Sequence, residues 1–413
     1  MSQVNVKKRG TKWQYIFEGA KIDGKRKRIT KSGFRTKKEA LEAGVAALAE
    51  YNNAGAHFEP SEISVSDYMD YWYKNYTLTN CKYNTQQGYG RIIKNHIKPS
   101  IGLYKLKSLT PSILQEFING KYKSGYSKNY LINMITVLSG SLKYAVHPCK
   151  FIKDNPMQYV RYPKYEHSKL ETNHKLISNE DFNKIIDRFP FGSSFYMSLI
   201  LGYYTGCRIG EVMGLTWDDV DFNNSSIYIN KIMYKRDKSM CFGSTKTLSS
   251  VRTIKISKTL INILKAQKKW QIENRMKYGS HYTQQYIKEE HIGNEVIKIL
   301  YSFPSSFEFP FEKVNLINTK ENGEMITPDS FKYASRVIHN DLGLTFNFHS
   351  LRHTHATTLI ENGANPKDVQ TRLGHSKIQT TLDTYTHATE KMAEETVEIF
   401  DKAINDDCCP NKI

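Results

Sequence analysis

The sequence predicts a multidomain, mostly helical protein. A small basic module of β-sheet plus one helix comes first, a helical domain follows, and a mostly α domain with a small β-sheet or hairpin ends the chain. The 413 residues leave room for two or three domains. Strand-like alternation is concentrated near the N-terminus and in residues 226–256, whereas apolar residues elsewhere recur with a helical period. The expected domains are residues 1–58, 62–165 and 175–413.

The composition indicates a polyanionic partner. There are 59 Lys and Arg residues against 41 Asp and Glu, a formal net charge of +18, and such an excess is typical of proteins that bind nucleic acid. The N-terminus is polar and basic, and the longest apolar run, residues 195–204, is too short to cross a bilayer, so we expect no signal peptide and no membrane contact. Six cysteines at scattered spacings favour a reducing, cytoplasmic location without disulfides and give no zinc pattern.

Residues 1–58 form the basic module. The segment 13–17 alternates as a strand does, and the basic run 25–31 follows Gly24, which predicts a hairpin. A helical stretch from 37 to about 52 must cover this hairpin, because an isolated two-stranded hairpin is marginal in water. A basic β-ribbon can enter a major groove; contact with phosphates only, or a solubilising role, is the alternative. The expected DNA-binding residues are Lys25, Arg26, Lys27 and Arg28.

Residues 62–165 form the helical domain, between linkers at 55–62 and 161–176. The strongest helix, 128–147, carries an apolar side with Leu131, Ile135 and Leu138. Lysines and tyrosines are interleaved before and into it, which is compatible with ordinary helix surface or with DNA contact. The DNA-binding residues expected here are Lys121, Lys123 and Lys128.

The third domain begins with two helices, 178–189 and 195–204. Strand-like pieces between 226 and 256 follow, and those around Lys246 predict a hairpin. Ser257 then caps a long helix. Residues 278–310 show little pattern and are interpreted as an insertion to which no function is assigned.

Residues 349–385 concentrate the side chains suited to phosphate chemistry. A helical period after residue 348 places His349 and Arg352 on one face. Asn365-Pro366 and Gly374 bound a short helix, 366–373, with His375 just past its end. Arginine offers a rigid fork that fits phosphate oxygens, histidine moves protons near neutral pH, and an activated tyrosine forms covalent intermediates. The set with Tyr385 predicts attack of a phenol on a phosphodiester, which needs no metal and no cofactor.

A second cluster lies upstream, at Thr205-Gly206-Cys207-Arg208-Ile209-Gly210-Glu211, and continues to Trp217. Gly206 lets the backbone near Arg208 approach phosphate closely, and Glu211 is expected to hold the helix start or to orient the guanidinium. The two clusters together resemble the two motif boxes of the tyrosine recombinase (phage integrase) family, T-G-x-R-x-x-E-x-x-x-L-x-W and H-x-L-R-H with L-G-H and Tyr. Integrases of conjugative transposons are most similar, and the resemblance extends more weakly over the whole chain.

The resemblance implies a tyrosine recombinase fold and a site-specific DNA recombinase that excises and integrates a mobile element through a 3′-phosphotyrosine. It implies that the N-terminal module reads arm sites, that the helical domain binds the core site, and that a hairpin lysine protonates the leaving 5′-oxygen. Lys246 matches that lysine best, with Lys238 and Lys255 as rivals. Arg252 is expected to contact backbone phosphate. The implied catalytic residues are Arg208, Lys246, His349, Arg352, His375 and the nucleophile Tyr385.

The implied partners are double-stranded DNA at recombination and arm sites, a homo-tetramer on DNA that is a monomer or weak oligomer when free, and an excisionase-type accessory protein. Other classes stay open: a type IB topoisomerase-like enzyme, a non-catalytic DNA-binding regulator, and a hydrolytic zinc enzyme using His349, His353 and His355. Against a zinc enzyme, no glutamate follows His349, as a His-Glu-x-x-His site requires. A predicted helix at 390–404 packs either on its own domain or on a neighbouring protomer.

Overall fold

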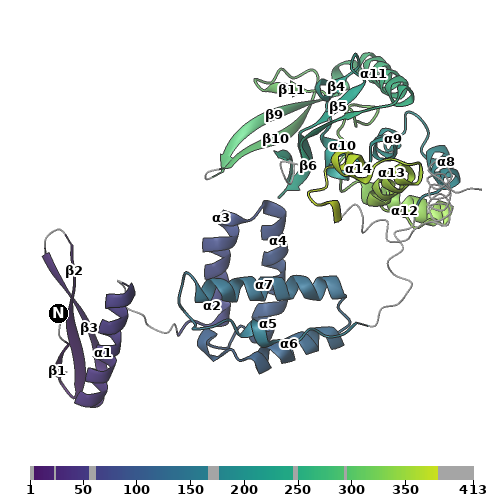
Figure 1. Ribbon diagram of the computed structural model, residues 1–413. Helices are drawn as coiled ribbons and strands as arrows, with labels where there is room; N and C mark the ends of the chain where they lie inside the picture. The colour runs from purple at the N-terminus through teal and green to yellow at the C-terminus, as the bar shows by residue number, and fades with distance from the viewer. Residues whose placement is uncertain are drawn as a thin grey trace, which may run out of the picture. The chain divides into compact units, whose positions relative to one another are not determined.

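The computed structural model describes residues 4–22, 25–54, 62–165, 176–244, 250–292 and 295–379. The chain divides into two compact units, Met1–His167 and Ser168–Ile413 (Figure 1). No helix within the described ranges is long and apolar enough to span a membrane.

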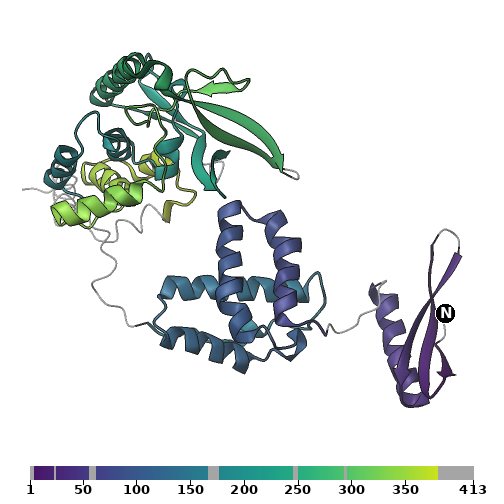
Figure 2. The same cartoon turned by 180° about the vertical axis from the view of Figure 1, so that it is seen from behind.

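The first unit begins with a three-stranded antiparallel sheet in the order β1-β2-β3, formed by Asn5–Arg9, Lys12–Ile22 and Lys25–Phe34. Helix α1 (Lys37–Ala54) covers one face of the sheet (Figure 2), and Tyr15 and Phe17 are buried between them. Gly44 permits this close packing, since a Cβ there would lie 2.9 Å from the Cβ of Tyr15. The predicted hairpin and helix are confirmed. Strand β1 was not predicted, because it is mostly exposed and shows little alternation.

The rest of the first unit is helical, as predicted, and Trp72, Leu114 and Leu138 lie in its core. Local caps set the helix starts: the Thr110 hydroxyl accepts a hydrogen bond from the Ile113 backbone N–H at 3.3 Å. One-turn π-helical segments, η1 and η2, continue α2 and α4. The elements are α2 (Val65–Trp72), η1 (Tyr73–Thr77), α3 (Leu78–Asn80), α4 (Tyr83–Ile92), η2 (Ile93–Ile97), α5 (Lys98–Ile101), α6 (Pro111–Lys123) and α7 (Lys128–Val146).

The second unit is built around a buried helix, α9, that packs against α10 and α13. Gly202 of α9 allows the α13 contact, because a Cβ there would lie 2.6 Å from the Phe348 ring and 2.8 Å from Leu351. The helices are α8 (Asn179–Arg188), α9 (Tyr196–Thr205), α10 (Ile209–Gly214), α11 (Lys258–Tyr278), α12 (Phe331–Leu342), α13 (Phe348–Glu361) and α14 (Pro366–Leu373). The helices predicted at 178–189, 195–204 and 366–373 are confirmed within one residue at each end.

Two small sheets accompany these helices. The first has the order β4-β5-β8, formed by Val220–Asp221, Ser226–Ile229 and Arg252–Lys255. The second has the order β11-β9-β10-β7-β6. Its strands are β6 (Lys231–Arg236), β7 (Ser239–Ser244), β9 (Thr283–Ile292), β10 (Glu295–Pro304) and β11 (Glu312–Val314).

The hairpin predicted around Lys246 lies largely outside the described residues, since residues 245–249 are not described. Among the described strands, β6 pairs with β7 through a turn at Asp237 with φ of 51°, and β8 pairs with β5. The region 278–310, interpreted as patternless, contains the long hairpin β9–β10, which joins the sheet through Leu300 opposite Met240 (Figure 1). Its alternation is obscured because Ile297, Ile299 and the adjacent Leu300 are all buried.

Candidate active site

The junction of α9 and α10 presents Arg208. Gly206 ends α9 in the left-handed conformation, with φ of 65°, and Arg208 is the N-terminal cap of α10. The Glu211 carboxylate accepts hydrogen bonds from the Arg208 backbone N–H at 3.0 Å and from its Nη1 at 2.8 Å. Glu211 therefore both holds the helix start and orients the guanidinium, the two structural roles expected from the sequence. The Arg208 side chain stays 38% exposed, so it can meet a ligand.

Burial opposes ionisation of Glu211, but the charge and hydrogen bonds of Arg252, together with Arg208, outweigh it and hold the pKa of Glu211 below its usual value. The carboxylate is thus a buried anion with two cationic partners. Such a carboxylate keeps its geometry only while both partners are present.

Arg352 lies in α13, whose start is capped by the Asn347 side chain. Its guanidinium is almost completely buried and joins the C-terminal ends of α9 and α14: Nη1 donates to the Gly206 carbonyl at 2.9 Å and Nη2 to the Leu373 carbonyl at 2.8 Å. The Nε atom is buried and makes no hydrogen bond within the described residues. Burial first, and then the nearby Arg208 charge, lower the pKa of Arg352 to about 9, so it stays protonated at neutral pH.

His375 follows Gly374, which ends α14 in the left-handed conformation with φ of 68°. The Gln370 Nε2 donates a hydrogen bond to the His375 carbonyl at 2.9 Å. Burial, followed by the charges of Arg352 and Arg208, lowers the pKa of His375 to about 3. The imidazole is therefore neutral at physiological pH and can donate one hydrogen bond without adding charge.

The structure brings four of the predicted catalytic residues together. Arg208, Arg352 and His349 all act electrostatically on His375, and the ring of His349 lies against that of His353, with centroids 4.6 Å apart. The other two predicted catalytic residues, Lys246 and Tyr385, lie outside the described residues.

Of the two rivals of Lys246, Lys255 is directed elsewhere. Its ammonium donates to the Asn224 carbonyl at 2.8 Å, in the turn between β4 and β5. Lys238 lies at the turn of the β6–β7 hairpin, beside Asp237. Lys246 lies outside the described residues, so its assignment remains a prediction.

Arg252 does not occupy the place expected of it. A residue that contacts DNA phosphate must present donors to solvent, but the Arg252 side chain is only 5% exposed and forms an ion pair with Glu211 at 3.1 Å. The prediction of a phosphate contact is wrong for this reason. The sequence did not distinguish the two environments, because an arginine at the start of a strand carries no signal of burial.

Two further residues lie near the site: His355, which the sequence analysis considered only as a zinc ligand, and Arg372, which it did not single out. His355 Nδ1 bonds the Tyr203 carbonyl at 2.9 Å, and Nε2 accepts from Arg372 Nε at 3.0 Å. These contacts require a neutral imidazole with its proton on Nδ1. The spacing offered a signal, since His355 lies three residues after Arg352 and Arg372 directly precedes the Leu373-Gly374-His375 run.

The His355 contacts predict a pH-dependent stability. Burial, and then the Arg372 charge, lower the pKa of His355 from 6.5 to about 4. The unfolded chain therefore binds more protons between these pH values, so the free energy of unfolding falls as pH falls from 6.5 to 4. We expect His355→Asn, which cannot titrate but keeps a donor for the Tyr203 carbonyl, to lose less melting temperature than the wild type over this window. Thermal unfolding at several pH values measures this, with pH 8 as the reference; equal losses would contradict it.

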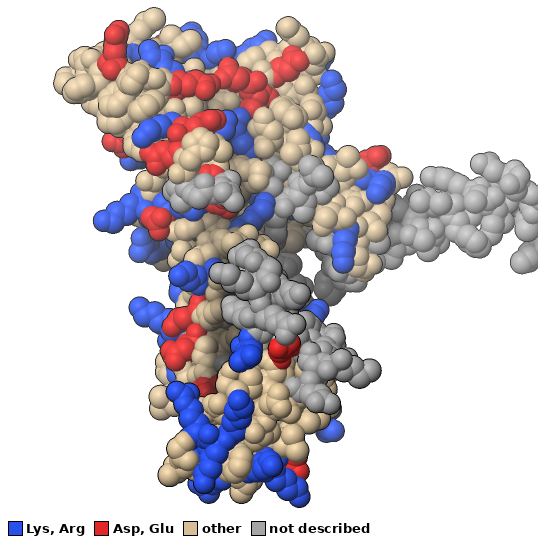
Figure 3. All heavy atoms as spheres, turned by 90° about the vertical axis from the view of Figure 1, so that its left-hand side faces the viewer, with Lys and Arg blue, Asp and Glu red and all other residues tan. Residues whose placement is uncertain are grey.

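The predicted DNA-binding residues of the first unit are only partly described. Lys123, Lys128 and Arg28 are exposed, whereas the Lys121 ammonium lies 5.3 Å from the centre of the Phe117 ring. Nothing is described of the Lys25, Arg26 and Lys27 side chains, although these residues belong to β3. Figure 3 shows Lys and Arg side chains spread over one face of the molecule with Asp and Glu among them. The DNA contacts of these residues remain predictions.

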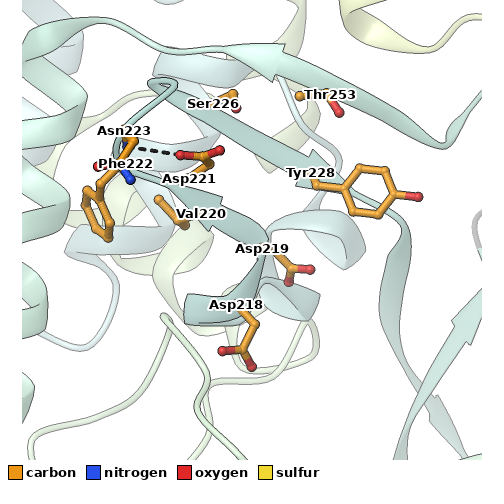
Figure 4. Close-up of a pocket in the computed structure, with 9 residues that line it drawn as sticks. All are labelled: Asp218, Asp219, Val220, Asp221, Phe222, Asn223, Ser226, Tyr228 and Thr253. Carbon is orange, nitrogen blue, oxygen red and sulfur yellow. Dashed lines mark hydrogen bonds between the residues drawn. The ribbon is translucent and has the colours of Figure 1, made fainter.

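A cavity of about 670 Å³ lies beside the β4-β5-β8 sheet (Figure 4). Its lining includes Asp218, Asp219 and Asp221, and the site residues that the structure describes do not line it. Asp219 already accepts from the Thr216 backbone at 2.8 Å, and Asp221 from the Asn224 side chain at 2.7 Å. An acidic lining disfavours a phosphate ligand, so this cavity is separate from the candidate active site.

Comparison with known protein families identifies the family that carries this arginine–histidine site. The model of the phage integrase family matches residues 178–392, more than half of the chain and the whole arginine–histidine site. The chain belongs to the phage integrase family. The N-terminal SAM-like domain of phage integrases matches residues 64–122, and an arm DNA-binding domain matches residues 3–45.

Relatives of this phage integrase family member cover most of its length. A tyrosine recombinase XerC-like protein of Caldanaerobacter subterraneus is 29% identical over 88% of this chain and 89% of its own. The ICEBs1 integrase of Bacillus subtilis is 25% identical over 92% and 94%. The Tn1549 transposon integrase, solved with transposon right end DNA, shares the fold, with a TM-score of 0.61, 21% identity, and coverage of 82% and 100%. The chain is a tyrosine recombinase, an enzyme that cleaves and rejoins DNA.

Proposed function

We propose that this tyrosine recombinase is the integrase of a mobile element and that it excises and integrates that element through a 3′-phosphotyrosine intermediate. The observation that carries the proposal is the juxtaposition of two guanidinium groups and a neutral imidazole, from Arg208, Arg352 and His375, in one site. Relatives that are integrases of mobile elements support the biological setting.

The three side chains suit one scissile phosphate. The exposed Arg208 offers a guanidinium that Glu211 holds in place, and Arg352 has an unpartnered Nε donor within the described residues. The neutral His375 adds a hydrogen-bond donor. Preorganised donors of this kind stabilise charge as it develops on the phosphate oxygens, which is usually the largest contribution of an active site to its rate.

The chemical step uses Tyr385 as nucleophile. Its phenolic oxygen bonds to phosphorus while the bond from phosphorus to the 5′-oxygen breaks, His349 accepts the phenolic proton and Lys246 protonates the leaving 5′-oxygen. The free 5′-hydroxyl of a partner strand then attacks the phosphotyrosine and releases Tyr385. One phosphoester replaces another at each step, so the bond energy is retained and the reaction needs no metal and no cofactor.

The proposed partners follow from the same chemistry. The net charge of +18 and the match of residues 3–45 to an arm DNA-binding domain support double-stranded DNA with both core and arm sites. Two exchanges of strands between two duplexes require four nucleophiles, and hence a homo-tetramer on DNA formed from monomers or weak oligomers. An excisionase-type accessory protein would set the direction of the reaction.

Trapping of the covalent intermediate tests this function. The full chain is mixed with a nicked duplex from which the cleaved end diffuses away, and the adduct is identified by denaturing electrophoresis. Peptide mass spectrometry of the adduct is expected to place the nucleotide on Tyr385. Binding without any adduct would indicate a DNA-binding regulator, and relaxation of supercoiled DNA without strand exchange would indicate a topoisomerase.

A further inference from the structure

We propose that Arg252 is a positioning residue for the strand-cleavage step, acting on Arg208 through Glu211 and on the segment that carries His375 through the Arg372 carbonyl. This inference rests on the proposed function. It replaces the DNA contact that the sequence suggested for Arg252.

The Arg252 guanidinium is fully occupied inside the protein. An arginine has five N–H donors, and here each has an acceptor. Nε donates to the Arg372 carbonyl at 2.6 Å. Nη1 donates to the Ser250 carbonyl at 3.0 Å and to Glu211 at 3.4 Å. Nη2 donates to Glu211 at 3.1 Å and lies 3.6 Å from the Cys207 sulfur. No donor remains for a phosphate, so any influence of Arg252 on the reaction passes through these neighbours.

The first route leads through Glu211 to Arg208. The Glu211 side chain is 2% exposed and bonds Arg252 on one side and Arg208 on the other. Without Arg252, the buried carboxylate would have Arg208 as its remaining cationic partner among the described residues. A buried charge that loses one partner binds the other more strongly, so the Arg208 guanidinium would be drawn inward and away from the phosphate.

The second route leads along the end of α14. Arg252 holds the carbonyl of Arg372, and the next carbonyl, that of Leu373, receives Nη2 of Arg352 at 2.8 Å. His375 comes two residues later. A single guanidinium therefore ties the strand β8 to the turn that places both Arg352 and His375.

The side chain of Arg372 reinforces that turn. Its Nη1 donates to the Lys255 carbonyl at 2.8 Å and its Nη2 to the Tyr204 carbonyl at 3.3 Å. The C-terminal end of α14 is thus fixed to both ends of β8, through Arg252 at its start and Lys255 at its finish. This redundancy predicts that a conservative change at Arg252 leaves the domain folded while the site loses its alignment.

The test compares Arg252→Lys with wild type in the full chain. A lysine keeps the charge but offers a single nitrogen, which cannot bridge Glu211 and the Arg372 carbonyl in the same way. Single-turnover cleavage is measured at saturating nicked duplex, together with DNA affinity and melting temperature. We expect cleavage to slow by roughly 10²-fold, the loss typical when one stabilising donor is misplaced, while affinity changes less than about threefold. Arg188→Met, which removes a surface ion pair with Asp341 in the same unit, is the control and should cleave at the wild-type rate.

A second substrate separates positioning from a general structural defect. A neutral methylphosphonate replaces the scissile phosphate, so the guanidinium groups have less charge to stabilise. The deficit of Arg252→Lys is expected to shrink at least tenfold on this substrate, whereas a misfolded fraction would lower cleavage of both substrates equally. If Arg252→Lys unfolds, Glu211→Gln is compared with the double variant Arg252→Met/Glu211→Gln. The neutral glutamine removes the buried charge and with it the first route, so the second change should then cost less than the 10²-fold expected of Arg252→Lys.

The outcomes are distinct. Three results would overturn the inference and leave the proposed function standing. The Arg252→Lys variant could cleave as fast as the wild type, it could lose equal activity on both substrates, or the double variant could lose a further 10²-fold. Failure of the wild type itself to form an adduct would overturn the proposed function instead.

Discussion

Replacement of Tyr385 by phenylalanine is expected to abolish the covalent protein–DNA adduct. The substitution removes one oxygen, the atom proposed to form the bond to phosphorus, and a phenyl ring has no nucleophilic atom. DNA affinity should stay within about twofold of wild type, because the ring and the basic surface are retained. Denaturing electrophoresis after trapping on nicked duplex measures the adduct, and a gel-shift titration measures the affinity.

Tyr333→Phe is the matched control for this experiment. Tyr333 is 56% exposed on α12 of the same unit, and its loss of a hydroxyl should leave adduct formation unchanged. An undiminished adduct in Tyr385→Phe would show that another group is the nucleophile, and peptide mapping of that adduct would identify it.

Replacement of Arg208 by lysine is expected to slow strand cleavage by roughly 10²–10³-fold, as removal of a preorganised donor does in other active sites. The Arg208 guanidinium bonds Glu211 through Nη1, and its side chain stays 38% exposed, so further donors can reach a phosphate. A lysine ammonium has one nitrogen, which the buried Glu211 carboxylate would retain. The protein should stay folded, because the Arg208 backbone N–H still bonds Glu211 and caps α10.

Single-turnover cleavage at saturating DNA measures the effect of Arg208→Lys, and Arg188→Lys serves as its control at a surface ion pair. Wild-type cleavage by Arg208→Lys would show that a point charge suffices at this position. The oriented hydrogen bonds of the guanidinium would then have no role in the reaction.

Local signals predicted much of the candidate site. The short helix before His375 was bounded correctly because an asparagine cap, a first-turn proline and a terminal glycine act within a few residues of one another. The role of Glu211 followed from its three-residue spacing to Arg208, which places both at the first turn of one helix. The proximity of Arg208 to Arg352, by contrast, was inferred from a family resemblance, since nothing local joins residues so far apart.

The sequence by itself determined the features whose causes are local, namely the helix caps and the glycines that end helices. It also determined the excess of basic residues, which indicates a polyanionic partner. Only the tertiary structure decided that Arg252 is an internal ion-pair partner, that β8 pairs with β5, and that residues 283–304 form a hairpin joined to β7. The physical reason is the same in each case. Burial of a charge and pairing of a strand depend on partners supplied by distant segments, and an arginine written in the sequence looks the same whether it faces a phosphate or a buried glutamate.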